Sequence, residues 1–331
     1  AGAYARATTS RTGILDTKNL HTYKFNEDLF KKVTILPDGK NHGLVFVLDW
    51  SGSMSREMLD TIKQLYNLIW FCTKLQIPFE VYAFTQCFPN RNEETGETET
   101  SYEPKDGLFS VDPNFSLMNL FTSKVRGKKL DEQLKNLFAV VGSFTNYDAA
   151  RVVPVGMGLS GTPLNESIVA LHKIIPQFRK ENNVEKVNCV ILTDGEAYPL
   201  HYHHEVQRSW EDKPFLGTRN VGSNCFLRNR KTGKTYKSGA HYSDFTPILL
   251  RDICDTLPDV NFVGIRIMPS REIGNFLRQN MEDWNAPEFN ANREYWRKTK
   301  TIALKGTGYH IYFGLCSSAL SNDTEFEVDE D

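Results

Sequence analysis

The chain alternates between apolar runs of strand length and stretches in which apolar residues recur every three or four positions. Residues 44–49 and 187–194 are nearly continuous apolar runs, which is typical of strands buried on both faces of a sheet. Residues 57–75 have helical spacing, and so do residues 162–182, which open with Thr-Pro as many helices do. The pattern therefore predicts strands and helices that follow one another along the chain.

The rest of the chain continues this alternation. Residues 79–85 alternate like a strand, and Pro176 predicts a kink or an early stop in the helix that contains it. Strands and helices in this order need crossover connections, so we predict an α/β fold with a Rossmann-like, doubly wound, mostly parallel sheet flanked by helices. Further helices are expected at residues 245–257 and 271–281, and further strands at residues 260–267 and 309–315.

Polar and charged stretches divide the chain. Residues 90–107 are acidic without periodicity, and residues 322–331 carry six acids and no cations, which is typical of disorder. Residues 226–239 combine a Thr-Gly turn with five cations, which predicts a β-hairpin with a solvated surface. We expect a lead-in that packs on the domain (residues 1–42), one domain (residues 43–316) with insertions at about residues 86–130 and 196–244, and a disordered acidic tail (residues 317–331).

Charge and cysteine usage limit the classes of partner and the compartment. The 331 residues include 39 Lys and Arg against 41 Asp and Glu, a near balance that argues against nucleic acid or a membrane as the main partner. No apolar run approaches the roughly 20 residues of a membrane span. The six cysteines show no Cys-x-x-Cys spacing and are typical of buried thiols in a reducing compartment, so we expect a cytoplasmic protein.

Hard oxygen ligands gather where two strands are expected to end. Asp49 ends the first apolar run, and Ser51 and Ser53 follow at alternate positions. Thr162 begins a predicted helix, and Asp194 ends the second apolar run. Sheets of this class bind ligands at the carboxyl ends of their strands, near the topological switch point. Two carboxylates and three hydroxyls, without sulfur or imidazole, favour Mg²⁺ or Mn²⁺ with water in the remaining positions.

The same three segments resemble, in order, the metal-ion-dependent adhesion site of von Willebrand factor A domains. They are Asp-x-Ser-x-Ser at residues 49–53, Gly-Thr-Pro-Leu-Asn at residues 161–165 and Thr-Asp-Gly-Glu at residues 193–196, and all five ligand positions match. The resemblance implies a Rossmann-like binding module whose divalent cation recruits an acidic side chain from a protein partner. Read without it, the residues would be helix caps and a turn.

The lead-in narrows this resemblance. Residues 13–32, together with Asp-Gly-Lys before the first strand, are similar to the carboxyl-terminal part of the cobaltochelatase T subunit of cobalamin biosynthesis, including versions encoded by large bacteriophages. The similarity covers roughly residues 12–84 and 158–194, and residues 196–244 depart from it. It implies a non-catalytic subunit of an ATP-dependent metal chelatase, an adaptor for a MoxR-like AAA+ ATPase or its client, located in the host cytoplasm if phage-encoded.

A histidine cluster lies in the second expected insertion. His201, His203, His204 and Glu205 offer imidazole and carboxylate ligands that suit zinc or iron. Their spacing matches neither His-Glu-x-x-His nor a pair four residues apart, and adjacent residues point to opposite faces of a strand or helix. Solvated or packing histidines are therefore the leading interpretation, with a second metal site as the alternative; His241 and Cys225 could join it only if the fold brings them near.

Enzyme functions find less support. The chain has no P-loop, no Gly-x-Ser-x-Gly nucleophile elbow, and Ser51 where a haloacid-dehalogenase-type phosphatase needs a second aspartate. Two hypotheses remain: an adaptor of an AAA+ remodelling or chelatase machine, and a structural or attachment protein, for example of a phage particle, that uses the same fold for assembly. A metal-dependent hydrolase built on the histidine cluster is a third.

Overall fold

The computed structural model describes most of the chain in seven segments. The lead-in before residue 42, most of the acidic stretch at residues 90–107 and the tail after residue 319 lie outside them, so the expectations for those parts stay predictions. No helix of the described part is long and apolar enough to cross a membrane. The described segments are residues 42–86, 102–145, 153–195, 197–210, 212–239, 244–281 and 287–319.

A seven-stranded sheet forms the centre of the protein, in the order β11-β12-β10-β5-β1-β2-β4. The pairs β1–β2, β1–β5, β5–β10 and β10–β12 are parallel, whereas the edge strands β4 and β11 run antiparallel to their neighbours. The predicted mostly parallel α/β sheet is therefore confirmed. The strands are β1 (His42–Asp49), β2 (Phe79–Thr85), β4 (Ser116–Thr122), β5 (Lys186–Thr193), β10 (Val260–Met268), β11 (Thr301–Leu304) and β12 (Ile311–Cys316).

The strand order changes direction at β1. Its neighbour on one side is β2, the next parallel strand in the chain, and its neighbour on the other side is β5, from which β10 and β12 continue outward. This is the arrangement of a doubly wound sheet, in which the loops that leave the carboxyl ends of the two central strands diverge to opposite faces. The carboxyl ends of β1 and β5 are therefore the expected ligand position.

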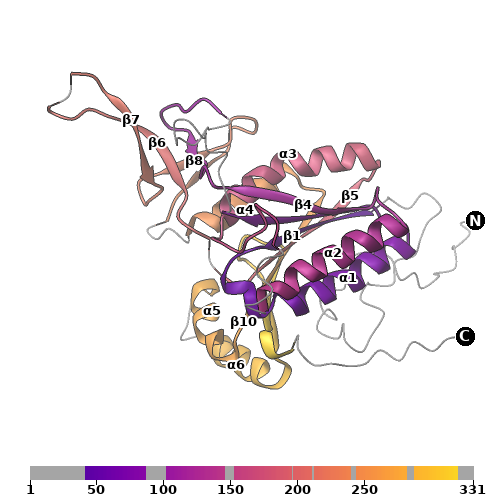
Figure 1. The fold of residues 1–331 in the computed structure, drawn as a ribbon. Helices are drawn as coiled ribbons and strands as arrows, with labels where there is room; N and C mark the ends of the chain where they lie inside the picture. The colour runs from indigo at the N-terminus through magenta and orange to yellow at the C-terminus, as the bar shows by residue number, and fades with distance from the viewer. Residues whose placement is uncertain are drawn as a thin grey trace, which may run out of the picture.

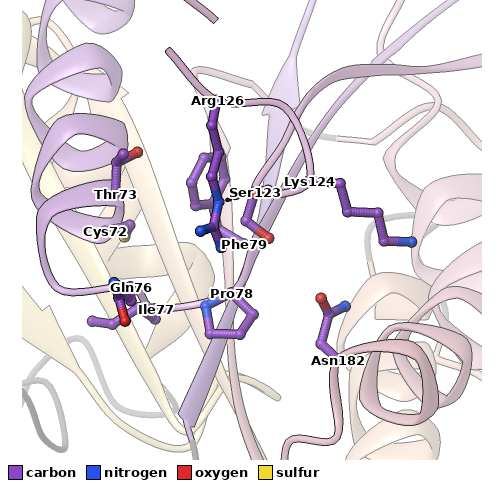
Figure 2. A pocket seen from close by; sticks show the side chains of 10 residues that line it. All are labelled: Cys72, Thr73, Gln76, Ile77, Pro78, Phe79, Ser123, Lys124, Arg126 and Asn182. Carbon is purple, nitrogen blue, oxygen red and sulfur yellow. Dashed lines mark hydrogen bonds between the residues drawn. The ribbon is translucent and has the colours of Figure 1, made fainter.

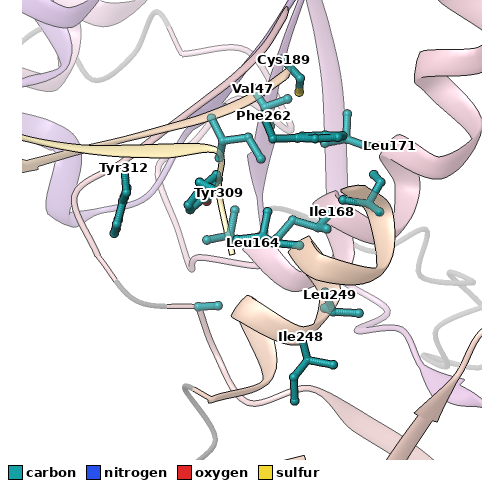
Figure 3. Close-up of a cluster of buried hydrophobic side chains, with 14 of the residues drawn as sticks. Val47, Leu164, Ile168, Leu171, Cys189, Ile248, Leu249, Phe262, Tyr309 and Tyr312 are labelled. Carbon is teal, nitrogen blue, oxygen red and sulfur yellow. The ribbon is translucent and has the colours of Figure 1, made fainter. Parts of the chain in front are cut away.

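Helices cover both faces of the sheet (Figure 1). Leu44, Phe46 and Leu48 of β1 pack with α1 and α2, whereas Val45 and Val47 point to the other face and pack with α3 and α4. Figure 3 shows part of this second cluster. The helices are α1 (Met58–Lys74), α2 (Lys128–Thr145), α3 (Leu164–Asn182), α4 (Phe245–Thr256), α5 (Ile273–Asn280) and α6 (Pro287–Thr299), with short 3₁₀ helices η2 (Ser53–Arg56), η5 (Ser270–Glu272) and η6 (Ser317–Ala319).

Helix α3 continues through Pro176 to Asn182, so of the two alternatives predicted there, a kink or an early stop, the early stop is wrong. A proline inside a helix costs roughly 3 kcal/mol, because it removes one backbone hydrogen bond and crowds the preceding turn. The apolar side chains on both sides of Pro176 are buried against the sheet, and each contributes about 1.5–3 kcal/mol. Burial of Leu171, Ile175 and Phe178 therefore outweighs the local cost.

Two small sheets lie outside the central one. Strands β3 (Phe109–Ser110), β6 (His201–Val206) and β7 (Phe215–Asn220) form the first. Strands β8 (Phe226–Arg228) and β9 (Thr235–Lys237) form the hairpin predicted from the cation-rich segment. The segment at residues 86–130 was expected to be an insertion, but β4 belongs to the central sheet. Most of its side chains are only partly buried, and Asn119 is exposed, so no continuous apolar run marks this strand.

Gly264, in the middle of β10, lies where the sheet meets two tyrosines. A Cβ atom there would come within 2.6 Å of Tyr312 and 2.7 Å of Tyr309. We expect Gly264→Ala to lower the free energy of unfolding by about 1–3 kcal/mol, because the packed rings must shift. Gly142→Ala is the control: its Cβ meets nothing within 4 Å, and alanine in a helix gains about 0.5–1 kcal/mol. Urea unfolding measures both, and equal effects would contradict the packing argument.

Candidate metal centre

Asp49 and Thr193 lie side by side at the carboxyl ends of β1 and β5. The two strands are in register up to Leu48 and Leu192, so the next residue of each strand falls at the same edge. The Thr193 hydroxyl donates a hydrogen bond of 2.6 Å to Asp49 Oδ2. The other carboxylate oxygen, Asp49 Oδ1, is buried and has no hydrogen-bond partner among the described residues. A fully buried carboxylate thus has one oxygen left to bind a ligand.

Ser51, Ser53 and Asp194 form a chain of contacts beside Asp49. The hydroxyls of Ser51 and Ser53 are 3.0 Å apart, and Ser53 Oγ donates to Asp194 Oδ1 at 2.9 Å. The turn between the end of β1 at Asp49 and the start of η2 at Ser53 is short, which brings the two serine hydroxyls close together. Four of the five residues predicted as ligands therefore lie together. Ser51, Ser53 and Asp194 are joined by direct side-chain contacts. Asp49 is joined to them through Thr193, the residue before Asp194.

Thr162 is placed by backbone pairing. Ser51 and Ser160 form an isolated parallel bridge, in which the Gly52 amide donates to the Ser160 carbonyl at 2.8 Å. Thr162, two residues after Ser160, is buried and lies two residues before Leu164, where α3 begins. Its carbonyl accepts a hydrogen bond of 3.3 Å from the amide of Tyr198. The backbone thus brings the loop that carries Thr162 to the loop that carries the two serines.

The carboxylates of this site are poorly compensated. Burial raises the pKa of Asp49 to about 7, and the charge of Asp194 adds to this effect, against hydrogen bonds from Thr193 and Ser51 that lower it. Burial also raises the pKa of Asp194, which Arg266 partly offsets. Glu57 has a raised pKa too, caused first by burial and then by Asp194. Negative charge concentrates here without an equal positive charge among the described residues.

The donor set fits a hard divalent cation. Its oxygens are carboxylate and hydroxyl oxygens, the ligands that Mg²⁺ and Mn²⁺ prefer, and a free carboxylate oxygen is buried among them. Exposure is graded across the site, since Asp49 and Ser51 are buried, Asp194 is half-buried and Ser53 is exposed. The side of Ser53 and Asp194 is therefore the one that a partner molecule can reach.

Trp50 joins the two loops of the site, a role that the sequence pattern did not indicate. Its ring is buried, packs edge-on against Phe144, and donates from Nε1 to the Met157 carbonyl at 2.7 Å. Its backbone carbonyl accepts from the Ser160 amide at 3.4 Å, and its own amide donates to the Phe84 carbonyl at 2.9 Å. Trp50 is thus a positioning residue for the loop that leads to Thr162.

The histidine cluster does not assemble into a metal site. His203 is buried and its Nε2 lies 2.9 Å from the Tyr102 hydroxyl, whereas His204 Nδ1 lies 3.5 Å from Asp106 Oδ1 and His201 is exposed. The alternation along β6 separates the two neighbouring rings, as expected. Within the described segments, no group of three or more His, Cys, Asp and Glu side chains could hold a metal ion. Of the remaining candidates, Glu205 is exposed, Cys225 accepts a hydrogen bond from the Gly222 amide, and His241 lies outside the described residues.

Two cavities formed by described residues lie near the amino ends of parallel strands, opposite the carboxyl ends that carry the candidate site. The first has about 120 Å³ and lies between the end of α1 and the start of β2 (Figure 2). Its Lys124 is paired with Glu181. The second has about 320 Å³ and includes His310, just before β12. Pro78 and His310 lie just before β2 and β12, at the amino ends of these parallel strands. Because the candidate metal centre lies at the carboxyl ends, the length of the strands separates both cavities from it.

Comparison with known proteins adds only partial structural similarity. No family model matches the chain, and no curated protein matches it. Three solved structures are similar in part, and the chain spans less than two fifths of each of them. They are the pilus adhesin SpaC from Lactobacillus rhamnosus GG (12% identity, TM-score 0.36, 70% of this chain and 25% of that chain), proximal thread matrix protein 1 from the mussel byssus (13%, 0.30, 70% and 38%) and the type V pili tip protein Mfa5 from Porphyromonas gingivalis (10%, 0.27, 83% and 38%). Similarity at this level carries no argument about function.

Trp50→Phe tests the positioning role. The variant keeps an aromatic ring but leaves the Met157 carbonyl without its donor, so we expect a loss of about 1–3 kcal/mol in stability and several-fold weaker Mn²⁺ binding. Trp296→Phe is the matched control, since Trp296, on α6, is also buried and its ring Nε1 donates to Ser270 Oγ at 3.1 Å. Calorimetric Mn²⁺ titration and urea unfolding separate the two effects. Equal Mn²⁺ affinity in both variants would contradict the positioning role.

Glu166, in the first turn of α3, is a second buried carboxylate near Thr162. Its Oε2 has no hydrogen-bond partner among the described residues. Burial raises its pKa to about 7, and the charge of Asp112 adds to the effect, against a backbone hydrogen bond that lowers it. Between about pH 4.5 and 7 the folded protein therefore holds a proton that the unfolded chain releases, so this residue makes stability fall as pH rises.

We expect Glu166→Gln to remove this pH dependence. The variant should match the wild type near pH 4.5 and exceed it by up to about 3 kcal/mol at pH 8, since one pKa unit corresponds to about 1.4 kcal/mol. Urea unfolding of both proteins across this range gives the difference directly, without contributions from other carboxylates. A difference that does not change with pH would show that Glu166 is not held in its protonated form.

Proposed function

We propose that the protein is a divalent-cation-dependent protein-binding module of the von Willebrand factor A type. The single observation that supports this most is the free buried oxygen of Asp49 at the switch point of the sheet, next to the hydrogen-bonded chain of Ser51, Ser53 and Asp194. The sequence resemblance to a metal-ion-dependent adhesion site uses the same residues. The proposed cofactor is Mg²⁺ or Mn²⁺.

Each side chain has a distinct role in this proposal. Asp49 and Asp194 supply two negative charges, and the hydroxyls of Ser51, Ser53 and Thr162 complete the cradle without adding charge. A bound divalent cation supplies a Lewis-acidic position for an outside carboxylate. Because only two of the five proposed ligands are carboxylates, the cation would keep a position that a partner's Asp or Glu can enter from the exposed side of Ser53. The process is reversible binding: a carboxylate oxygen of the partner would coordinate the cation in place of a water molecule, and no covalent bond would be made or broken.

The partner proposed is a MoxR-like AAA+ ATPase or its client. The support is the similarity of residues 12–84 and 158–194 to the cobaltochelatase T subunit, together with the absence of a P-loop from the sequence. The chain would then be a non-catalytic adaptor that couples an ATPase to metal chelation or protein remodelling. Its own contribution is the cation-dependent contact at the carboxyl ends of β1 and β5.

Asp49→Ala tests the proposal. Removing this carboxylate should abolish Mg²⁺-dependent capture of the partner in a pull-down from native lysate, while the fold is kept, because no apolar contact is lost. The apo protein should be at least as stable as the wild type, since a buried carboxylate with a raised pKa disfavours folding at neutral pH. Asp131→Ala, on the exposed surface of α2, is the control. Unchanged Mg²⁺-dependent capture by Asp49→Ala would rule out the adhesion-site function.

A further inference from the structure

A strongly basic segment follows the last metal ligand in the chain. Residues 197–239, here called the basic arm, contain eight Lys and Arg against three Asp and Glu, whereas the whole chain has 39 against 41. The arm comprises β6, β7 and the β8–β9 hairpin, and the β6–β7 hairpin projects from the body of the protein (Figure 1). Positive charge is therefore concentrated in the segment that leaves the site directly after Asp194, while the rest of the chain is acidic.

The base of the arm is fixed to the metal centre. The Tyr198 amide donates to the Thr162 carbonyl at 3.3 Å, and Asn165 Nδ2 donates to the Tyr198 carbonyl at 3.0 Å. The Val221 amide, at the end of β7, donates to the Leu200 carbonyl at 2.9 Å. The hairpin thus begins and ends beside the first turn of α3. Its orientation relative to the ligands is set by the same turn that positions Thr162.

The second hairpin is fastened along α4. Asn229 Nδ2 donates to Asp252 Oδ1 at 2.9 Å, and the Tyr236 hydroxyl donates to Asp255 Oδ2 at 2.6 Å. Lys234 also pairs with Asp255 at 2.9 Å. These contacts account for one cation of the hairpin. The other four are exposed and form no ion pair with a described residue: Arg228, Arg230, Lys231 and Lys237.

The arm also exposes apolar surface and a free strand edge. Trp210 is 77% exposed and Phe226 62% exposed, although large aromatic side chains are usually covered. Strand β7 ends the order β3-β6-β7, so its outer backbone groups pair with no described strand. An exposed strand edge of this length is normally protected by charged side chains, prolines or bulges, or it pairs with another polypeptide. On β7, Arg219 is exposed beside that edge. Aromatic residues and arginines together are typical of binding surfaces.

We propose that the basic arm is the second half of the docking surface and binds an extended acidic segment of the partner protein. This rests on the proposed function, because the same segment supplies the carboxylate for the metal centre. Pairing with the edge of β7 provides the main-chain contacts, and the unpaired cations provide selectivity for acidic side chains. The free strand edge favours a polypeptide over nucleic acid, which has no backbone amides to pair with it.

The test uses the full chain and a fluorescein-labelled peptide of five Glu-Thr repeats, with binding followed by fluorescence anisotropy at low salt. The triple variant Arg219→Ser, Arg228→Ser, Lys237→Ser should bind the peptide about tenfold more weakly, since each exposed ion pair contributes up to about 1 kcal/mol. The matched control is Lys128→Ser, Lys129→Ser, Lys135→Ser, which removes the same charge from the exposed surface of α2. It should bind like the wild type.

Repeating the titration with Mg²⁺ and with chelator, and on Asp49→Ala, separates the two proposals. Weaker binding by the arm variant, with the Mg²⁺ dependence retained, supports the inference. If the arm variant binds like the wild type while Asp49→Ala alone loses the Mg²⁺ dependence, the arm inference is overturned and the metal-dependent function stands. Binding that needs the arm but never Mg²⁺ overturns the joint surface and the proposed function. Preference of the arm for a single-stranded oligonucleotide over the peptide overturns the assignment to an acidic protein segment.

Discussion

The parallel pairing of β1 with β5 is the constraint on which the site depends. It places Asp49 next to Thr193 at the switch point of the sheet, where Asp49 Oδ2 accepts a hydrogen bond from the Thr193 hydroxyl and the buried Oδ1 has no partner among the described residues. A carboxylate in this position is unfavourable as an anion, which is why burial raises its pKa. A buried group that weakens the apo fold is understandable if a ligand compensates for it, and a divalent cation is the ligand its neighbours are suited to bind.

The sequence predicted the parts of this structure that follow from local patterns. The continuous apolar runs identified β1 and β5 because both faces of these strands are covered by helices, and the ends of those runs located Asp49 and Asp194. Less apolar elements were not predicted, such as β4 at the sheet edge and α6, because their partly exposed faces give no regular pattern. The early stop considered at Pro176 is wrong for a different reason, since tertiary burial of the apolar face of α3 outweighs a local preference.

Contacts between distant residues could not be read from the sequence. The hydrogen bond from Trp50 to Met157 joins positions 107 residues apart, and the one from Thr193 to Asp49 joins positions 144 apart. Trp50 had no role that spacing could suggest, yet its ring and backbone hold the loop that leads to Thr162. The basic composition of the arm was visible in the sequence as a charged hairpin. Its attachment beside Thr162 was not, and this attachment turns a charged surface into a candidate part of the site.

The proposed function requires one divalent cation to be held jointly by five residues: Asp49, Ser51, Ser53, Thr162 and Asp194. The most direct measurement is an anomalous difference map from crystals of the chain grown with Mn²⁺. We expect one strong peak at the carboxyl ends of β1 and β5, about 2.0–2.2 Å from the coordinating oxygens, as is usual for small hard cations. A map with no peak there from crystals in millimolar Mn²⁺, or with its only peak at the histidines of β6, would contradict it.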